Sequence, residues 1–245
     1  MLVETEKNLQ NTKHPVRRDF KVIAVAGVTS GSGKTSLAEA IIKLLSKQNL
    51  VGAAKITVTH GEKGCPHGGK GCNTCSSLGG EYQIINKPSV ISQRGTDTSR
   101  FETAGGKPVV WVITKDTAFV EAWCEAVESF QAESFIVVES NTLALKSKPD
   151  MTVMIVDPSV SRKLWKTSAC LLIEQADVLV FNKRGNENQV ALALEETKKI
   201  RGDKNGIIFV NHPHEIVKEK AFIENLESLL FNDDRVVRGV YEILT

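Results

Sequence analysis

The residues best suited to chemistry lie between positions 25 and 40, in the segment VAGVTSGSGKTSLAEA. A glycine-rich turn there follows an apolar run and precedes an amphipathic one, and it fits the phosphate-binding pattern G-x-x-x-x-G-K-[ST] except at its first position. Gly31 and Gly33 allow backbone N–H groups to turn inward around phosphate oxygens. The expected contacts are Thr29, Ser30, Gly31, Ser32, Gly33, Lys34, Thr35 and Ser36.

Lys34 and Thr35 are the side chains of this turn that we expect to act on a nucleotide. Lys34 can reach the β- and γ-phosphates of a nucleoside triphosphate, and the Thr35 hydroxyl can ligate Mg²⁺. Val28 replaces the first glycine of the pattern, with Gly27 one position early, which leaves the conformation at the start of the turn open. A turn that binds nothing is the alternative, but the strand and helix patterns on either side favour a phosphate site.

Magnesium in such sites also needs a carboxylate at the end of a strand. Glu139 and Asp157 each end a predicted strand. Both are therefore expected to complete the magnesium shell or to orient water, as catalytic residues beside Lys34 and Thr35. The alternative for each is a helix cap or a strand end in contact with solvent.

Two further sets of polar residues could contact the nucleotide or a substrate. Asp97 and Arg100 follow a polar stretch and could sense the γ-phosphate or hold a substrate, or could simply belong to a capped helix start. Arg162, Lys163 and Lys166 could form a lid over phosphate, although a solvated basic turn is the favoured interpretation.

A glycine-rich segment holds three of the five cysteines. Cys72 and Cys75 have C-x-x-C spacing, Cys65 can add a third thiolate, and His67 or His60 a fourth ligand, which predicts a metal site with Zn²⁺ as the default ion. An iron–sulfur cluster, a redox pair and a flexible loop with spare thiols are the alternatives.

The remaining two cysteines, Cys124 and Cys170, lie in amphipathic helical patterns, and we expect both in the core. An odd number of cysteines argues against a disulfide framework.

Apolar runs alternate with amphipathic helical patterns and predict an α/β fold. We expect a three-layer sandwich, with a mostly parallel sheet of about six to seven strands and helices on both faces. The expected strands cover 20–26, 53–59, 108–113, 134–140, 151–158, 177–183 and 206–211, and the expected helices 34–47, 117–130, 167–176, 188–200 and 214–230. The interval 81–106 is harder to interpret; it fits a short strand and a short helix starting near Asp97.

The domain organisation expected from these patterns is simple. Residues 1–18 are polar and predict a flexible arm, and 19–245 predict one phosphate-binding domain with a Cys/His-rich insertion at about 60–80. The net charge of +2 gives no reason to expect nucleic acid or a membrane as a partner. With no apolar signal segment or membrane-spanning run, a cytoplasmic location is expected.

Three segments resemble known P-loop proteins. The segments FIVVESNTLALKSKPDMTVMIVDPS (135–159) and ADVLVFNKRG (176–185) resemble the nickel-insertion GTPases of urease and hydrogenase maturation. The segment TDTSRFETAGGKPVVWV (96–112) resembles molybdopterin-guanine dinucleotide biosynthesis protein B. Cys65-Pro66-His67 also matches the Cys-Pro-His of the urease GTPases, where it binds metal, so Ni²⁺ is a further candidate.

The resemblance extends weakly over most of the chain from Lys21 to about Asn211. It implies a GTPase-like accessory protein, a homodimer that helps to mature a metal-containing cofactor or client enzyme.

The guanine-recognition motif implied by this resemblance is incomplete. Asn182 and Lys183 can contact and cover a base, but Gly185 stands where the motif has an aspartate. Losing a charged hydrogen-bond partner costs about 1.5–3 kcal/mol, so guanine selectivity should weaken. The nucleotide is GTP or ATP, with GTP favoured; a polar strand end that contacts no base is the alternative.

Three functions remain open at this point. The favoured one is a Mg²⁺-dependent triphosphatase acting in metal or cofactor maturation, with slow basal turnover because no clear catalytic base or arginine finger is present. The second is a small-molecule kinase, because TSGSGKTS also resembles the uridine kinase group. The third is a binding module without catalytic activity that depends on nucleotide or metal.

Overall fold

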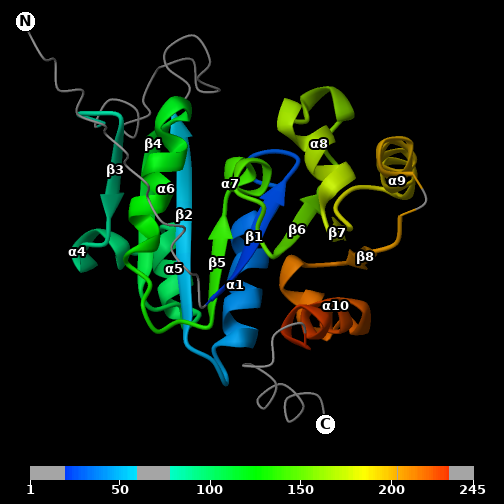
Figure 1. The fold of residues 1–245 in the computed structure, drawn as a ribbon. Helices are drawn as coiled ribbons and strands as arrows, with labels where there is room; N and C mark the ends of the chain where they lie inside the picture. Colours follow the sequence, from blue (N-terminus) through cyan, green and yellow to red (C-terminus); the bar gives the residue numbers. More distant parts are fainter. Residues whose placement is uncertain (1–19, 60–77, 203, 232–245) are drawn as a thin grey trace, which may run out of the picture.

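The computed structural model describes residues 20–59, 78–202 and 204–231, and within them an eight-stranded sheet (Figure 1). The strand order is β3-β4-β2-β5-β1-β6-β7-β8, and every neighbouring pair is parallel except β3 and β4. The strands are β1 (Lys21–Gly27), β2 (Val51–Thr59), β3 (Tyr82–Ile85), β4 (Val109–Lys115), β5 (Phe135–Glu139), β6 (Met151–Val156), β7 (Val178–Asn182) and β8 (Ile207–Val210).

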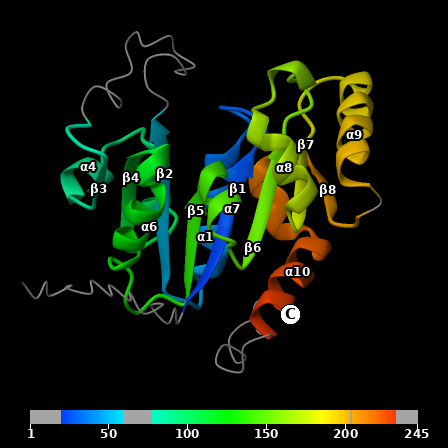
Figure 2. The same cartoon turned by 45° about the horizontal axis from the view of Figure 1, so that its top comes forward.

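Helices cover both faces of this sheet (Figures 1 and 2). The α-helices are α1 (Lys34–Leu45), α4 (Pro88–Ile91), α5 (Asp97–Thr103), α6 (Phe119–Val127), α7 (Asn141–Lys146), α8 (Thr167–Gln175), α9 (Glu187–Arg201) and α10 (Lys220–Phe231). Three short 3₁₀ helices complete the elements: η1 (Asp116–Ala118), η2 (Arg162–Leu164) and η3 (Pro213–Lys218). No helix in the described ranges is both long and apolar enough to span a membrane.

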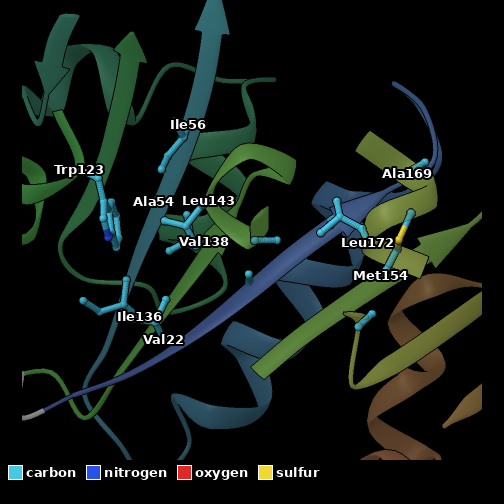
Figure 3. Packing of buried hydrophobic residues seen from close by; sticks show 14 of the residues in the cluster. Val22, Ala54, Ile56, Trp123, Ile136, Val138, Leu143, Met154, Ala169 and Leu172 are labelled. Atoms are coloured by element: carbon cyan, nitrogen blue, oxygen red, sulfur yellow. The ribbon is translucent and has the colours of Figure 1, made fainter. Parts of the chain in front are cut away.

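Two apolar cores lie on the two faces of the sheet, because successive strand residues point to opposite sides. Along β1, Val22 and Ala24 belong to the core under α6, α7, α8 and α9, whereas Ile23 and Val25 belong to the core under α1, α5 and α10. Figure 3 shows part of the first core, where Ala54 and Val138 from neighbouring strands meet Leu143 of α7. The inner strands β1, β5, β6 and β7 are buried on both faces, as expected for a parallel sheet between helices.

The predicted three-layer α/β fold is confirmed, and the sheet has eight strands rather than six or seven. The eighth strand is β3, which lies within the interval 81–106 where a short strand was expected, and it pairs antiparallel with β4 at the edge through Tyr82–Ile85. It has four half-buried or exposed residues, too few for a clear alternating pattern. The helix expected near Asp97 is present as α5.

Other local expectations need correction. The helix α7, six residues long, follows β5 directly and was not predicted, and the helix expected over 214–230 is divided into η3 and α10. Cys124 is exposed on α6, so its expected place in the core is wrong, and Cys170 is only partly buried. Cys124 lies outside the single buried stripe of α6, to which its neighbours Trp123 and Ala122 belong.

The sheet order fixes where a ligand can bind. From β1 the chain passes through α1 to β2 on one side, whereas β6, β7 and β8 lie on the other side. β1 is therefore flanked by β5 and β6, whose carboxyl ends carry Glu139 and, one residue beyond β6, Asp157. Ligands of open parallel sheets bind at this edge, where the strand order reverses.

Candidate phosphate and magnesium site

The loop between β1 and α1 has the conformation that a phosphate-binding turn needs. Gly31 and Gly33 have positive φ angles of 77° and 106°, which other residues rarely adopt. Gly33 is the N-cap of α1, and a Cβ there would lie 2.8 Å from Cγ of Pro213. The buried Ser32 hydroxyl donates to the carbonyl of Thr29 at 3.1 Å. The loop therefore presents the N-terminus of a 12-residue helix to a ligand.

Val28 in place of the first motif glycine is accommodated in the core. Its side chain is fully buried, and its backbone N–H donates to the Ile155 carbonyl at 3.1 Å. Close packing instead requires a glycine one position earlier, since a Cβ on Gly27 would lie 2.5 Å from Ser32 Oγ and 2.8 Å from Lys34 Cγ. The unusual start of the motif is thus compatible with an ordered loop.

Asn141 holds the start of the loop, a contact that sequence reasoning missed. Its Oδ1 accepts from the Gly27 N–H at 3.0 Å, and its Nδ2 donates to the Gly27 carbonyl at 2.9 Å and to Ser168 Oγ at 3.3 Å. Asn141 is the first residue of α7, which Ser140 caps by accepting from the Leu143 N–H. The sequence marks this position only by a polar Ser-Asn pair directly after a buried strand, and this pair does not identify Gly27 as the partner.

Lys34 is the first residue of α1 and lies next to the loop, where the charges of Lys55 and Lys166 affect it. Its ammonium donates to the Thr29 carbonyl at 2.6 Å. Burial lowers the pKa of Lys34 to about 8; Glu139 opposes this shift, and the positive charges of Lys166 and Lys55 add to it. Thr29 Oγ1 is buried without a hydrogen-bond partner among the described residues. Anionic oxygens bound in the loop would relieve both conditions.

Glu139 connects the loop to two strands. The side chain is 3% exposed, its Oε2 accepts from the Thr35 hydroxyl at 2.9 Å, and its Oε1 accepts from Lys55 Nζ at 2.5 Å. Lys55 Nζ also pairs with Asp97 Oδ2 at 2.8 Å. Burial alone would raise the pKa of Asp97, but the neighbouring Lys55 ammonium lowers it below its usual value.

This donor set fits Mg²⁺. The Thr35 hydroxyl donates a hydrogen bond to Glu139, so the lone pairs of the Thr35 oxygen can face a metal ion. Two carboxylates, from Glu139 and Asp97, lie around one shared cation, the Lys55 ammonium. Hydroxyl and carboxylate oxygens are the ligands that Mg²⁺ prefers, usually with several waters retained.

Asp157 has different neighbours from Glu139. It is 4% exposed, and its Oδ1 accepts from the Ser159 N–H at 3.0 Å and from the Ser159 hydroxyl at 2.6 Å. Its Oδ2 lies 3.7 Å from Arg184 Nη1, which donates to the Gly31 carbonyl at 3.3 Å. Of the two strand-end acids, Glu139 is thus the one hydrogen-bonded to Thr35, whereas Asp157 closes its own turn and connects Arg184 to the loop.

Asn182 is fully buried at the end of β7. In the amide orientation that satisfies its neighbours, its nitrogen donates to the Asn211 carbonyl at 3.2 Å and its oxygen accepts from Arg184 Nε at 3.0 Å. These contacts give Asn182 an internal role, whereas Lys183 next to it is exposed.

Gly185 cannot be replaced by an aspartate without strain. Its φ is +96°, and a Cβ would lie 2.5 Å from Gln189 Oε1. The Gln189 side chain also accepts from the Asn186 N–H in the capping box that starts α9. Restoring the missing aspartate by a single substitution would therefore disturb this cap.

Arg100 joins α5 to α1. Its Nε donates to Glu39 of α1 at 3.0 Å, and its Nη2 donates to Glu39 and, at 2.9 Å, to Ser36. Thr96 caps α5 by accepting from the Ser99 N–H at 3.2 Å. Asp97 is thus the residue of α5 that contacts Lys55, the partner of Glu139. Ser36 takes part in the contact between α1 and α5.

The basic turn divides into two parts. Arg162 donates to Cys170 Sγ at 2.7 Å, and Lys163 is exposed. Burial lowers the pKa of Lys166, and the nearby Lys55 ammonium lowers it further. Lys166 is exposed as well, which agrees with the interpretation as a solvated turn, although its charge interacts with those of Lys55 and Glu139.

The predicted ligands of the cysteine-rich segment lie outside the described residues. Cys65, His67, Cys72 and Cys75 all fall within 60–77, as does His60. In the ranges that the structure does describe, no group of three or more His, Cys, Asp or Glu side chains is placed to hold a metal ion. The zinc prediction stays a prediction.

Comparison with known proteins shows distant likeness in fold. No protein-family profile and no curated protein sequence matches the chain. Among solved structures, a LAO/AO transport system kinase gives a TM-score of 0.45 at 13% identity, over 92% of this chain and 65% of that one. The MinC:MinD cell division protein complex of Aquifex aeolicus gives 0.44 at 17%, over 89% and 99%. HypB from Helicobacter pylori, in complex with nickel, gives 0.45 at 11%, over 89% and 88%.

These likenesses are too distant to carry an argument about activity, and this chain spans less than two thirds of the LAO/AO kinase. The fold itself is clear from the molecule. A glycine turn between the central strand and the first helix, in a parallel sheet that reverses its order there, makes this a P-loop NTPase fold.

We predict that Asn141→Ala weakens binding of a non-hydrolysable triphosphate about tenfold, the equivalent of ~1.4 kcal/mol, because two hydrogen bonds to Gly27 are lost. Calorimetric titration measures the affinity. Asn188→Ala, on the exposed side of α9, is the matched control and should bind like wild type. Equal affinities for the two variants would show that Asn141 does not hold the loop.

We also predict that triphosphate affinity, measured in EDTA, falls between pH 8 and 9 by up to tenfold. Below pH 8 the Lys34 ammonium is charged before the ligand arrives, whereas above pH 8 the free protein must first take up a proton. Lys34→Arg keeps its charge throughout this range and should flatten the profile. An affinity of the wild type that is constant from pH 7 to 9 contradicts the prediction.

Proposed function

We propose that this chain is a Mg²⁺-dependent nucleoside triphosphatase, with GTP favoured over ATP, that assists maturation of a metal-containing cofactor or enzyme. The observation that carries the catalytic part is the contact of Thr35 with the buried Glu139, next to Lys34 in the glycine turn. Hydroxyl, carboxylate and ammonium are together the groups that hold a magnesium–triphosphate complex.

Each residue has a defined task in this proposal. The backbone N–H groups of the turn and Lys34 bind phosphate oxygens. Thr35 donates a hydrogen bond to Glu139, and its oxygen lone pairs bind the metal. Bound Mg²⁺ neutralises charge on the β- and γ-phosphates. Asp97 supplies a second carboxylate next to the Lys55 ammonium that it shares with Glu139. Asp157 closes its own turn with Ser159 and pairs with Arg184, so the metal is assigned to Glu139 and not to Asp157.

Slow basal turnover follows from the same contacts. Both oxygens of Glu139 accept hydrogen bonds, and Asp97 is paired with Lys55. Within the described residues, the carboxylates nearest Thr35 are thus engaged and poorly suited to take a proton from water. Acceleration by a partner or by a second copy of the chain, as in a homodimer, is part of the proposal.

The maturation role rests on the cysteine-rich segment and on the resemblance described above. We assign Cys65, Cys72, Cys75 and His67 to one bound metal, Zn²⁺ by default, with Ni²⁺ or an iron–sulfur cluster as alternatives. The segment follows β2, which ends at Thr59 on the edge of the sheet where the glycine turn lies. A client metalloenzyme in the cytoplasm is the proposed partner.

A small-molecule kinase is the second candidate, and Lys166 is the observation that favours it. Its backbone N–H donates to the Val28 carbonyl at 2.9 Å, at the start of the glycine turn, and the residue is exposed to solvent on that side. A cation in that position could follow a phosphoryl group to an acceptor. Phosphate transfer to a metabolite instead of water would identify this activity.

The triphosphatase proposal predicts that Lys34→Ala lowers affinity for Mg²⁺–triphosphate at least a hundredfold, because the charge at the phosphates is lost. Lys43→Ala, exposed on the same helix, should bind like wild type.

Competition titration should rank GTP above ATP by only a few fold, and phosphate release should be slow but measurable. Unchanged binding by Lys34→Ala refutes the phosphate site; binding without any turnover supports the non-enzymatic module.

The metal proposal predicts one ion or cluster per chain or per dimer after purification without oxygen. Replacing Cys65, Cys72 and Cys75 by serine should remove the metal, measured by elemental analysis, and should leave triphosphate binding within a few fold of wild type. Metal and nucleotide affinities should change each other equally if the two sites are coupled. Wild-type protein that contains no metal and takes up neither Zn²⁺, Ni²⁺ nor iron contradicts the assignment.

A further inference from the structure

Lys55 occupies the centre of the candidate magnesium site. Its ammonium lies 2.5 Å from Glu139 Oε1 and 2.8 Å from Asp97 Oδ2. The Lys55 side chain is 21% exposed, that of Asp97 37% and that of Glu139 3%. One cation thus bridges the two carboxylates that, in the proposed function, lie around Mg²⁺.

The sheet fixes Lys55 in this position. β2 and β5 are parallel neighbours, and their register pairs Lys55 directly with Glu139. Side chains at paired positions point to the same face, and on that face α5 brings Asp97 to the ammonium. The contact therefore does not depend on a chance rotamer of a surface lysine.

The same carboxylate serves two groups. Glu139 Oε1 accepts a hydrogen bond from the Lys55 ammonium, and Glu139 Oε2 accepts one from the Thr35 hydroxyl. Burial would lower the pKa of Lys55, but attraction to Glu139 and Asp97 raises it, so the ammonium stays charged at neutral pH. A purely structural ion pair could lie anywhere in the sheet, whereas this one lies against the expected metal-binding hydroxyl.

We propose that Lys55 is the resident cation of the magnesium site: it neutralises Glu139 and Asp97 while nucleotide is absent, and yields these carboxylates to Mg²⁺ when the ion arrives with triphosphate. This inference rests on the proposed function. Lys55 is a positioning residue, since it acts through the two carboxylates.

The proposal has an electrostatic consequence. Two buried or half-buried carboxylates without a counter-ion would attract a divalent cation, but an ammonium in hydrogen-bond contact with both repels it. Free Mg²⁺ should therefore bind the wild-type site poorly. A triphosphate adds several negative charges next to Thr35, and the site can then hold both cations.

Titration of nucleotide-free protein with Mn²⁺, followed by electron paramagnetic resonance and calorimetry, tests the proposal without hydrolysis. Lys55→Met should bind Mn²⁺ at least tenfold more tightly than wild type, and Lys55→Arg should not. Lys115→Met removes a cation paired with Glu81 on the neighbouring strand β4, and it should not change Mn²⁺ affinity. A gain of less than threefold in Lys55→Met overturns the proposal.

Two measurements keep the test decisive if Lys55→Met folds poorly. Mn²⁺ should raise its melting temperature more than that of wild type; a variant that folds neither with nor without Mn²⁺ counts against the proposal. In the double variant Lys55→Met, Asp97→Asn, the gain in Mn²⁺ affinity should be lost, because one carboxylate is removed.

Binding of Mg²⁺–triphosphate by the wild type separates the two proposals. If the wild type does not bind triphosphate, the proposed function fails. If it binds triphosphate and Lys55→Met shows no gain in Mn²⁺ affinity, the role of Lys55 alone fails.

Discussion

Burial of the Glu139 carboxylate constrains the whole candidate phosphate site. A carboxylate that is 3% exposed is tolerated in a sheet only when its charge is compensated and its oxygens accept hydrogen bonds. Thr35 provides one partner from the start of α1, and Lys55 provides the other from β2. The position of the helix and the register of the strand are therefore tied to the same group. A one-residue shift of β2 would turn Lys55 to the opposite face of the sheet.

The start of the glycine turn is held by hydrogen bonds from the opposite layer of the sandwich. Asn141 of α7 binds both backbone groups of Gly27, and the Lys166 N–H donates to the Val28 carbonyl. α1, in contrast, packs on the other face of the sheet. Because the backbone is fixed in this way, Val28 can serve as a core residue where the usual motif has a glycine.

The sequence was informative where the signal is local. The glycines and the Lys34-Thr35 pair lie within a few residues, and the buried strands have continuous apolar runs, so the turn and seven strands could be predicted. The contacts of Lys55 with Glu139 and of Asn141 with Gly27 join residues 84 and 114 positions apart. One lysine in a strand pattern, or one asparagine after a strand, does not reveal such a partner.

The exposure of Cys124 and the pairing of Arg100 with Glu39 escaped prediction for a related reason. Each depends on how a short helix, α6 for Cys124 and α5 for Arg100, is rotated about its own axis against its neighbours. Amphipathic spacing defines that rotation only to within about one residue. Among the strand-end acids, spacing alone ranked Glu139 and Asp157 equally. Their partners, Thr35 for one and Ser159 for the other, distinguish them only in three dimensions.

The charges around the turn indicate which end of a nucleotide provides most of the binding. Three lysines, Lys34, Lys55 and Lys166, influence one another and lie among two carboxylates, so the described phosphate end has a net charge of about +1. Burial lowers the pKa of Lys34 and of Lys166, repulsion among these cations lowers it further, and a bound polyanion would offset both effects. Asn182, the residue proposed to contact the base, is already hydrogen-bonded to Asn211 and Arg184. Affinity should therefore come mainly from the phosphates, with the identity of the base contributing less.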